Sequence, residues 1–424
     1  MERVDGSVET GMNVQIDSEY GKLEAVIVHT PGVEVESMTP QTAEEVLYND
    51  IIPISVVSKE HEKLKSFLSL VSHVYEVRDL LADVLEDPVA RGALIQAVAR
   101  YSHDVSRDAD LRRLRVPDLV ETLVSGLQQK RDTLHGFLSA RTFDIPPLPN
   151  LYFMRDGAMA FRDRVLIGSM AHRVRTNEAL FMKTLFAYSQ QFLSGGILFD
   201  GVQEAAEDVT LEGGDFLVVN ASTILVGLSE RTTAKAVDRL AERFEEVFNE
   251  PLTIFAVQLP LERSAIHLDM IFTILDKDVA LVYEPLILGR NRVPVYRMDI
   301  VPGKPRRIKQ VAGVIEGLRD HGVKLQTVLC GGSGPVHQQR EQWLSGTNLF
   351  AFAPGKVIGY DCNTETFRAA EHAGFAVRNV DDFLSGRDSV DEYDRLLVGL
   401  PGMELARGGG GARCMTLPIA RAPA

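Results

Sequence analysis

Short apolar runs recur along the chain and predict β-strands. Residues 22–29 (KLEAVIVH) are rich in β-branched side chains and end at Thr30-Pro31-Gly32, which predicts a strand followed by a turn. Four later segments each contain two short apolar runs separated by polar, Gly, Asn or Asp residues, the pattern of a β-hairpin. These segments are 159–168, 215–228, 270–283 and 349–361.

Helical stretches follow several of these hairpins, for example at residues 229–249 and 309–322. With the N-terminal strand, the hairpins predict about five similar β-rich units, each with a helix. Such repetition favours a radial or barrel-like α/β arrangement. The sequence identity between the units is too low to prove a repeat.

One region interrupts this β-rich pattern. Between residues 79 and 138 we expect no strand, because apolar residues recur there at helical spacing, as in Leu119, Leu123 and Leu127. Pro117 is expected to divide helices within it. We therefore predict a catalytic domain in two parts, 1–78 and 141–424, with a helical insertion at 79–140. The insertion carries no constellation of catalytic groups, so we expect it to serve packing or oligomer contacts.

The charge balance excludes several classes of partner. The 424 residues include 45 Lys and Arg against 59 Asp and Glu, a formal charge of −14. This field repels nucleic acid, and no local basic face offsets it. No stretch of about 18 apolar residues occurs and the N-terminus is acidic, so we expect a cytoplasmic protein without a membrane partner or a secretory signal. Its 45% hydrophobic residues are ordinary for a folded protein.

The three cysteines are Cys330, Cys362 and Cys414. They are too few for a disulfide framework, and no Cys/His cluster has zinc-ligand spacing. No nucleotide-binding fingerprint occurs between a predicted strand and helix. We therefore expect no metal, nucleotide or flavin cofactor, and any chemistry of a cysteine would be that of a thiol.

Candidate catalytic groups lie near the ends of the predicted strands. An apolar segment ends at Asp156, and Glu212-Gly-Gly-Asp215 precedes a strand. His267 and Asp269 are two residues apart, so on an extended strand they would point to the same side. Four glycines, 408–411, precede Cys414 and suggest a mobile loop that delivers a thiol.

Each of these residues also has an ordinary structural explanation. A lone acid such as Asp156 usually forms a turn or a surface charge. A single histidine such as His267 is more often structural than catalytic, and a single cysteine such as Cys414 is more often a small buried hydrophobic residue. Considered together, they supply a nucleophile, an acid/base group and several anions.

Such a set suits a cationic planar substrate. Several carboxylates around a thiol would repel an anionic substrate and raise the thiol pKa. A guanidinium reverses both effects, because its rigid fork of donors matches carboxylates and its charge favours a neighbouring thiolate. The implied chemistry is attack of a cysteine thiolate on a guanidinium carbon, with a histidine delivering a proton to the leaving amine.

At this point the chain resembles arginine deiminase, in the guanidine-modifying, amidinotransferase-like (pentein) superfamily. The resemblance covers almost the whole chain and rests on six ordered motifs. They are GKLEAVIVHTPGVEVESMTP, LPNLYFMRD, LEGGDFLVV, HLDMIF, REQWLSGTN with APGKVIGYDCN, and ARCMTLPIAR. The resemblance implies an α/β fold, a five-bladed pseudo-fivefold propeller of ββαβ units with an inserted all-helical subdomain.

The resemblance also implies roles for individual residues. Cys414 corresponds to the nucleophile that forms an amidino-thioether, and His267 to the general acid and then base. Glu212 would orient His267, and Asp156 and Asp269 would clamp the guanidinium nitrogens. Four residues match the part of the site that holds the α-carboxylate end: Asn150, Phe153, Arg175 and Arg231. Without the resemblance, both arginines would be read as helix-surface charges.

The sequence departs from the family pattern at three places. The loop before the nucleophile usually carries a second arginine five residues ahead of the cysteine, where this chain has Gly409. Gly334 stands where the family has an aspartate, and Asp361-Cys362-Asn363 replaces Asp-Arg-Asn. The missing loop arginine leaves the identity of the guanidino substrate more open than the reaction type.

The favoured hypothesis is hydrolysis of L-arginine to L-citrulline and ammonia. The alternatives are a deiminase, dihydrolase or amidinotransferase acting on another guanidino compound, and a non-catalytic binder of a cationic amino acid. The resemblance also implies a homo-oligomer.

Overall fold

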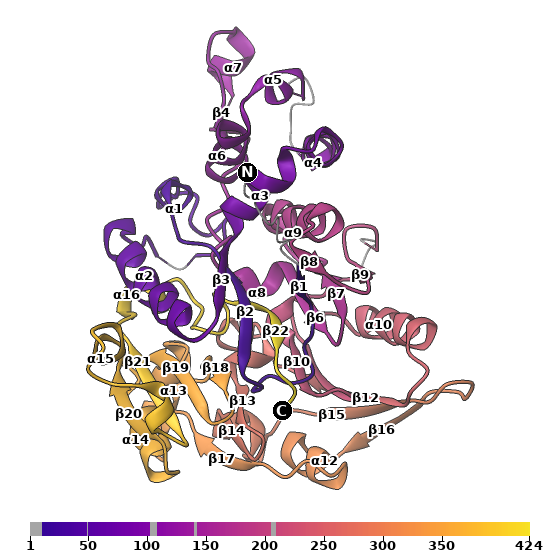
Figure 1. The fold of residues 1–424 in the computed structure, drawn as a ribbon, viewed down its shortest axis with the longest axis vertical. Coiled ribbons are helices and arrows are strands. Elements are labelled where there is room, and N and C mark those ends of the chain that lie inside the picture. The colour runs from indigo at the N-terminus through magenta and orange to yellow at the C-terminus, as the bar shows by residue number, and fades with distance from the viewer. Residues whose placement is uncertain (1–10, 49, 102–107, 140–141, 205–208) are drawn as a thin grey trace, which may run out of the picture.

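The structure is a computed structural model and describes residues 11–48, 50–101, 108–139, 142–204 and 209–424. The chain forms a mixed α/β fold (Figure 1). No helix in the described ranges is long and apolar enough to cross a membrane.

Five sheets share one strand pattern. In each, an outer strand runs antiparallel to a central strand, which runs parallel to a third strand. In that order the strands are β22 (Leu417–Arg421), β2 (Leu23–Val28) and β3 (His73–Glu76); β6 (Ala158–Phe161), β7 (Arg164–Ile167) and β9 (Ile197–Asp200); β10 (Phe216–Asn220), β11 (Thr223–Leu228) and β12 (Leu252–Gln258); β13 (Phe272–Asp276), β14 (Val279–Val282) and β17 (Gln326–Leu329); β18 (Phe350–Ala353), β19 (Lys356–Tyr360) and β21 (Leu396–Leu400).

The four predicted hairpins are confirmed. They form the antiparallel pairs β6–β7, β10–β11, β13–β14 and β18–β19. The predicted N-terminal strand is β2, and its antiparallel partner is β22 at the other end of the chain. The two ends of the chain therefore complete one sheet, a pairing that no local pattern could indicate.

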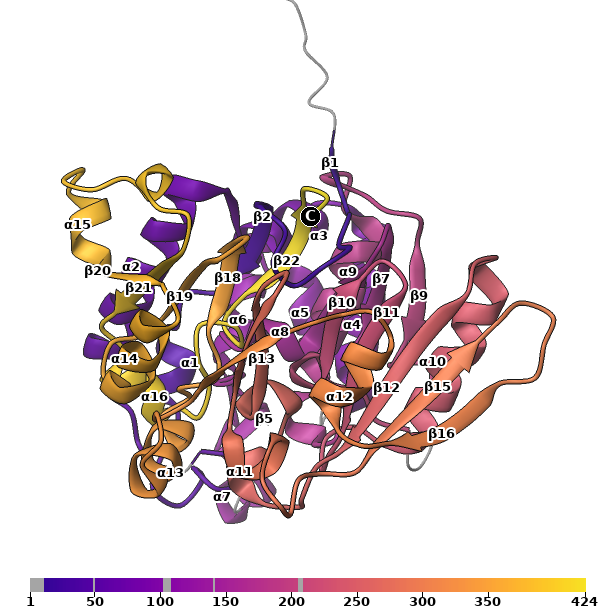
Figure 2. The ribbon, with the colours of Figure 1, turned by 90° about the horizontal axis from the view of Figure 1, so that it is seen from below.

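Helices connect the central and third strands of the sheets. The main ones are α2 (Ile54–Val71), α9 (Thr176–Tyr188), α10 (Ala234–Val247), α12 (Val314–Asp320) and α14 (Thr364–His372). Figure 2 shows α14 and α10 toward opposite edges of the view, with β18, β13 and β22 between them. Other helical segments are α1 (Val33–Glu36), α11 (Glu284–Ile287), α13 (Pro335–Trp343), α15 (Val380–Leu384), α16 (Met403–Arg407), η2 (Arg173–Arg175) and η6 (Val390–Glu392).

Two predicted helices are shorter than expected. The helix expected at 229–249 is α10, which begins after Thr233 in extended conformation. The helix expected at 309–322 begins only at Val314, and residues 307–311 form the strand β16 (Arg307–Val311). Because β16 is an edge strand with four exposed residues and one half-buried residue, it lacks the alternation that marks a strand with one buried face. It pairs with β15 (Val295–Ile300), which extends the third sheet beyond β12.

The region predicted as a helical insertion holds four helices among its described residues, and a fifth, α3, begins just before it. They are α3 (Val77–Leu85), α4 (Pro88–Tyr101), α5 (Asp108–Arg113), α6 (Val116–Ser125) and α7 (Leu134–Leu138). Figure 1 shows α4 to α7 at one end of the molecule. Pro117 lies in the first turn of α6, where its missing N–H costs nothing.

The expectation that this region has no strand was wrong in one detail. Leu127–Gln128 form the short strand β4, which pairs with β5 (Phe143–Ile145). Two residues are too short a run for any periodicity to show. The division at residues 79 and 140 remains a prediction. The other short strands are β1 (Met12–Asn13) with β8 (Phe192–Leu193), and β20 (Ala376–Asn379) beside β21.

Helix α2 attaches the N-terminal part of the chain to the fifth sheet. The fully buried ring of Phe67 makes edge contacts with Phe352 of β18 and Phe383 of α15, at centroid distances of 5.1 and 5.7 Å. Edge-to-face pairs of this kind stabilise a core beyond the area they bury.

We predict that Phe67→Ala lowers the free energy of unfolding by about 3–5 kcal/mol, because it removes a fully buried ring and leaves a cavity. Urea unfolding measures the change. Leu70→Ala on the same helix is the matched control, because Leu70 is 58% exposed and its loss should cost no more than about 0.5 kcal/mol. Equal losses for the two variants would contradict this packing.

Candidate active site

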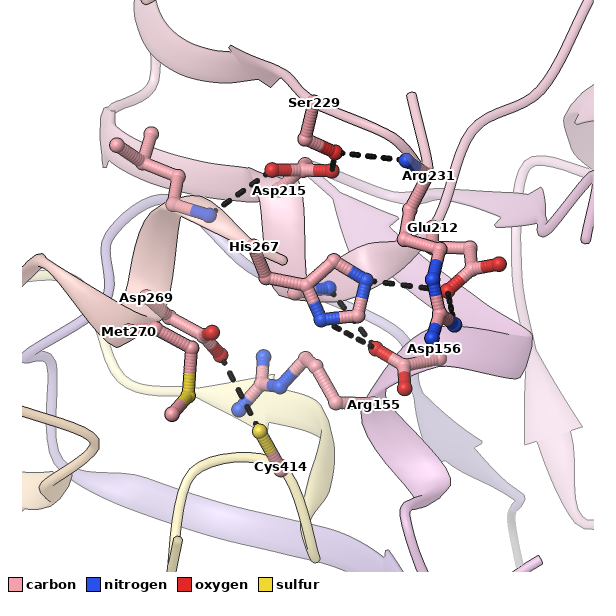
Figure 3. A network of polar contacts seen from close by, with 12 residues as sticks. Arg155, Asp156, Glu212, Asp215, Ser229, Arg231, His267, Asp269, Met270 and Cys414 are labelled. Carbon is pink, nitrogen blue, oxygen red and sulfur yellow. Dashed lines mark hydrogen bonds and ion pairs between the residues drawn. The ribbon is translucent and has the colours of Figure 1, made fainter. Parts of the chain in front are cut away.

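Five short segments each lead into the outer, antiparallel strand of one sheet, and the candidate catalytic residues lie on or directly beside four of them. These segments are α8 (Met154–Gly157) before β6, η3 (Gly213–Asp215) before β10, η5 (Leu268–Met270) before β13, residues 345–349 before β18, and the turn 412–415 before β22. The repeated strand pattern therefore brings residues far apart in the sequence to one place (Figure 3).

Hydrogen bonds join these five segments in a closed circuit. The Gly214 N–H donates to Asp156 Oδ1 at 3.1 Å, and the Leu268 N–H donates to Asp215 Oδ1 at 2.9 Å. Asn348 Nδ2 donates to the Asp269 carbonyl at 3.4 Å.

Two further bonds complete the circuit at the nucleophile candidate. The Cys414 N–H donates to Asn348 Oδ1 at 3.0 Å, and the Cys414 carbonyl accepts from the Arg155 N–H at 3.0 Å. Each segment thus fixes the backbone position of its neighbours.

A cavity of about 400 Å³ opens over this circuit. Of the nine residues that the sequence singled out, seven line it: Asn150, Phe153, Asp156, Arg175, Arg231, His267 and Cys414. The other two, Glu212 and Asp269, are fully buried and contact His267 and Cys414. All nine predicted site residues therefore lie together.

Cys414 is 4% exposed, and its Sγ lies 3.6 Å from Asp269 Oδ2. Burial raises the pKa of the thiol well above its ordinary value, and the carboxylates of Asp269 and Asp156 raise it further. The free site therefore favours the thiol, and an added cation would favour the thiolate.

One carboxylate oxygen of Asp269 lacks a hydrogen-bond donor among the described residues. Its Oδ2 accepts from Arg413 Nη1 at 2.8 Å, whereas its Oδ1 is buried with no hydrogen-bond partner among the described residues. An unpaired buried carboxylate oxygen is costly, so the Asp269 carboxylate retains one acceptor that a further donor would stabilise.

His267 lies between two carboxylates. Its Nε2 is 3.0 Å from Glu212 Oε2, and its Nδ1 is 3.8 Å from Asp156 Oδ1 (Figure 3). Burial lowers the pKa of His267, but Asp156, Glu212 and Asp215 together raise it to about 9. Protonated His267 therefore stabilises the fold below its ordinary pKa of about 6.5, and this contribution is lost as the pH rises through about 9.

Glu212 stays ionised although it is fully buried. Burial raises the pKa of its carboxyl, but Arg231 and the hydrogen bond to His267 hold it well below the ordinary value. Burial raises the pKa of the neighbouring Asp215 to about 7, although Ser229 Oγ and the Leu268 N–H donate to it. Asp215 was noted in the sequence only as part of the glycine motif, and it positions the His267 segment.

Both arginines expected to hold a carboxylate already contact protein acids. Arg175 Nη1 donates to Asp156 Oδ2 at 2.7 Å, and Arg175 Nη2 donates to Glu178 Oε2 at 2.8 Å. Arg231 Nη1 donates to Glu212 Oε2 at 3.3 Å, and its Nε donates to Glu230 Oε1 at 3.1 Å. Neither is a helix-surface charge, because they are only 3% and 5% exposed.

Sequence reasoning did not assign a role to Asn348 or Arg413. Asn348 connects the Cys414 N–H to the Asp269 backbone. Arg413 is 1% exposed and bridges Asp269 and Glu19. Its Nε donates to Glu19 Oε2 at 3.0 Å. Asn348 is the last residue of the REQWLSGTN motif, and Arg413 directly precedes Cys414. Their positions in or next to a motif were the only features of the sequence that could have pointed to them.

The glycine run before Cys414 packs closely against the site at three positions. A Cβ on Gly408, Gly410 or Gly411 would lie 2.3–2.6 Å from atoms of Tyr152, Phe153 or Asn348. Gly409 differs, because a Cβ there would meet nothing within 4 Å and its φ is +93°. Its conformation therefore favours glycine although space is available.

The other two departures from the family pattern lie away from the cavity lining. Gly334 precedes α13, and Asn363 Nδ2 donates to the Leu344 carbonyl at 3.1 Å. Neither residue, nor Asp361 or Cys362, lines the cavity around Cys414.

Asp156, Glu212 and His267 form a possible metal-ligand group within the described ranges, because their donor atoms lie within 4.8 Å of one another. Arg175 and Arg231 already contact these carboxylates, and His267 is held protonated by them. A metal requires neutral imidazole and would be repelled by the two guanidinium groups. The donor set therefore fits a charge network better than a metal site.

We predict that Glu212→Gln lowers the pKa of His267 from about 9 toward its ordinary value of about 6.5, because the variant removes a hydrogen-bonded carboxylate. Titration of the His267 imidazole signals by NMR measures the change. Glu246→Gln, which removes an exposed acid paired with Arg243, is the control and should leave this pKa unaltered. An unchanged pKa in Glu212→Gln would contradict the assigned coupling.

Known proteins resemble this chain over almost its whole length. The family model "Arginine deiminase" matches residues 44–421. The arginine deiminase of Listeria innocua is 32% identical over 436 residues, which cover 98% of this chain and 99% of the relative. The arginine deiminase of Borreliella afzelii is 30% identical over 426 residues, covering 96% and 98%.

Solved structures with lower identity share the fold. SxtG, an amidinotransferase from Microseira wollei, superposes with a TM-score of 0.52 at 15% identity and covers 97% of this chain and 98% of its own. The product-bound N-terminal domain of ArgZ, an arginine dihydrolase, has a TM-score of 0.51 at 13% identity, covering 94% and 98%. The fold is thus the mixed α/β fold of amidinotransferases. By its family model and its full-length relatives, the chain belongs to the arginine deiminase family.

Proposed function

We propose that this protein hydrolyses L-arginine to L-citrulline and ammonia through a covalent intermediate on Cys414. Family membership makes it a hydrolase of amidine C–N bonds. The observation that carries the catalytic proposal is the buried position of Cys414 beside the carboxylate of Asp269, with His267 lining the same cavity as Cys414.

The charges of the site support a guanidinium as the ligand. Asp269 Oδ1 has no partner among the described residues, and Asp156 lines the cavity beside His267. A guanidinium between these carboxylates would supply the missing donors. Its positive charge would also lower the pKa of Cys414, so the substrate itself would favour the thiolate.

In the first half-reaction, the Cys414 thiolate adds to the guanidinium carbon. His267 then protonates one amino group of the tetrahedral adduct, ammonia leaves, and a cationic amidino-thioether remains. A pKa of about 9 keeps His267 protonated near neutral pH, as this role as general acid requires.

In the second half-reaction, neutral His267 removes a proton from water, and the hydroxide adds to the amidino carbon. The C–S bond breaks, the ureido product leaves and the thiolate returns. The hydroxyl proton of this second adduct is taken up by the released ammonia, so the sum is arginine cation plus water to citrulline plus ammonium. Glu212 positions His267 through their 3.0 Å contact in both halves.

Gly409 in the loop before Cys414 is compatible with guanidino substrates other than L-arginine. Gly409 leaves its part of the cavity without a side chain, which accommodates guanidino compounds other than L-arginine. Transfer of the amidino group to an amine, or a second hydrolysis, would use the same Cys414 intermediate. Mass analysis of the products separates these reactions.

We further propose that the five sheets are the five blades of a pseudo-fivefold propeller. The shared order of an antiparallel pair followed by a parallel strand, with a helix between the last two strands, supports this arrangement. The circuit of hydrogen bonds among the five pre-strand segments supports it as well. A homo-oligomer and a cytoplasmic location remain predictions.

We predict that purified protein converts L-arginine to a ureido product and that Cys414→Ala abolishes this turnover, because no other thiol lines the cavity. A colorimetric assay for ureido compounds, with mass detection of citrulline, measures this turnover. Cys362→Ala is the matched control and should retain activity, since Cys362 lies outside the cavity lining. Absence of product from a folded sample, or full activity of Cys414→Ala, would refute the proposal.

We also predict that 2-chloroacetamidine, a cationic haloamidine, labels Cys414 faster than Cys330 or Cys362 at neutral pH. Burial raises the pKa of all three thiols, to about 12 for Cys330 and about 11 for Cys362, but only Cys414 lines the cavity, where the cation of the reagent would bind near the carboxylates and favour the thiolate. Peptide mass mapping after timed quenching measures the rates, with neutral iodoacetamide as the comparison reagent. Labelling without preference for Cys414 would favour a non-catalytic binder.

A further inference from the structure

A second group of buried charges adjoins Cys414 without lining the cavity. Its members are no more than 7% exposed, and they are Glu19, Arg155, Arg413 and Arg421. The reaction proposed above gives no role to Glu19, although a carboxylate is costly to bury unless its charge is used or compensated.

The guanidinium of Arg413 joins Glu19 to the site. Its Nη1 donates to Asp269 Oδ2 at 2.8 Å, whereas its Nε and Nη2 donate to the two oxygens of Glu19 at 3.0 and 3.1 Å. Nη2 also donates to the Phe216 carbonyl at 2.8 Å. Asp269 Oδ2 lies 3.6 Å from Cys414 Sγ (Figure 3). A continuous chain of contacts therefore runs from Glu19 through Arg413 and Asp269 to the sulfur.

Strand β10 holds Glu19 in place. The Val218 N–H donates to Glu19 Oε1 at 3.1 Å, and the Glu19 N–H donates to the Val218 carbonyl at 2.8 Å. Burial raises the pKa of Glu19, but the charges of Arg413 and Arg155 lower it more, so that it falls to about 2. Glu19 is therefore a fixed negative charge on the far side of the Arg413 guanidinium from Asp269.

This arrangement limits what Arg413 can do to Asp269. A guanidinium presents two edges that each match a carboxylate, and Glu19 occupies the edge that carries Nε. Arg413 thus gives Asp269 one donor, and Asp269 Oδ1 stays without a partner among the described residues. Without the charge of Glu19, the guanidinium would be drawn toward Asp269, and its positive charge beside the thiol would be uncompensated.

We propose that Glu19 is a positioning residue for the reaction at Cys414, which holds Arg413 by its Nε edge and so keeps the Asp269 carboxylate available to a cationic substrate. The inference rests on the proposed function for the place of the cation beside Asp269. Glu19 does not line the cavity, so it acts through Arg413 and Asp269.

Two alkylating reagents measure this role at Cys414: neutral iodoacetamide and cationic 2-chloroacetamidine. In Glu19→Gln, the uncompensated charge of Arg413 should lower the pKa of the thiol by about one unit. Neutral alkylation should then become about threefold faster, because the thiolate fraction rises more than its nucleophilicity falls. The cationic reagent loses attraction to the site, so the ratio of the chloroacetamidine rate to the iodoacetamide rate should fall about tenfold.

The ratio separates this role from a merely structural one. A loosened fold would speed both reagents equally and would also expose the buried Cys330, which peptide mass mapping detects. At one neutral pH, the other groups that face Cys414 keep their charges in both proteins. These groups are Asp156, Tyr152, His267 and Tyr360.

Two further variants complete the test. Glu24→Gln removes an exposed acid from the nearby strand β2 and should leave the ratio within about twofold. Glu19→Asp keeps the charge but reaches one methylene less far, so the ratio should fall only about threefold, as for one weakened hydrogen bond. A ratio equal to that of the wild type in folded Glu19→Gln would overturn the inference. If Glu19→Gln does not fold, an unchanged ratio in Glu19→Asp would overturn it.

The labelling test requires no turnover, so it separates this inference from the proposed function. If the wild type forms no ureido product but the ratio falls in Glu19→Gln, the proposed reaction fails and the positioning role stands. If product forms and the ratio is unchanged, the inference alone fails. Where product forms, Glu19→Gln should also lower kcat/KM for L-arginine by about tenfold, and Glu24→Gln by no more than about twofold.

Discussion

The site depends on the hydrogen bonds that join the five segments preceding the first strands of the five sheets. Cys414 is held through its backbone on both sides, by Asn348 Oδ1 and by the Arg155 N–H. Its thiol position is therefore set by residues from distant parts of the chain rather than by the glycine run alone. Because the circuit is closed, displacement of one segment would shift Asp156, His267 and Cys414 together.

The buried charges divide the floor of the cavity into two halves. Around His267, the negative charges of Asp156 and Glu212 are paired with Arg175 and Arg231. The carboxylates of this half therefore have ion-pair partners before any ligand binds. Around Cys414, Arg413 occupies only one oxygen of Asp269. The first half maintains the protonation state of His267. In the second half, Asp269 contacts the sulfur through Oδ2 and keeps its Oδ1 unpaired among the described residues. Unsatisfied buried acceptors are rare, so the second half is where ligand binding has the most to gain.

The sequence predicted those secondary-structure elements that are determined by residues adjacent in the chain. Hairpins such as β6–β7 were found because their strands and turn are adjacent, whereas β16 was missed because an exposed edge strand has no apolar face. The pairing of β2 with β22 joins the two ends of the chain, and no periodicity encodes such a contact. In the site, titratable residues next to glycines were identified, but the roles of Asn348 and Arg413 exist only in three dimensions.

The charged residues that line the cavity differ in burial between its floor and its mouth, where Glu44 and Arg263 are exposed. The floor groups are almost fully buried, so their charges interact strongly and each depends on the others. The charges at the mouth are exposed and unpaired, so one can change without disturbing the circuit below. Gly409 lines the cavity with free space around it, and none of the hydrogen bonds that hold Cys414 and His267 involves it. A departure from the family pattern at this position is therefore compatible with unchanged chemistry at the sulfur.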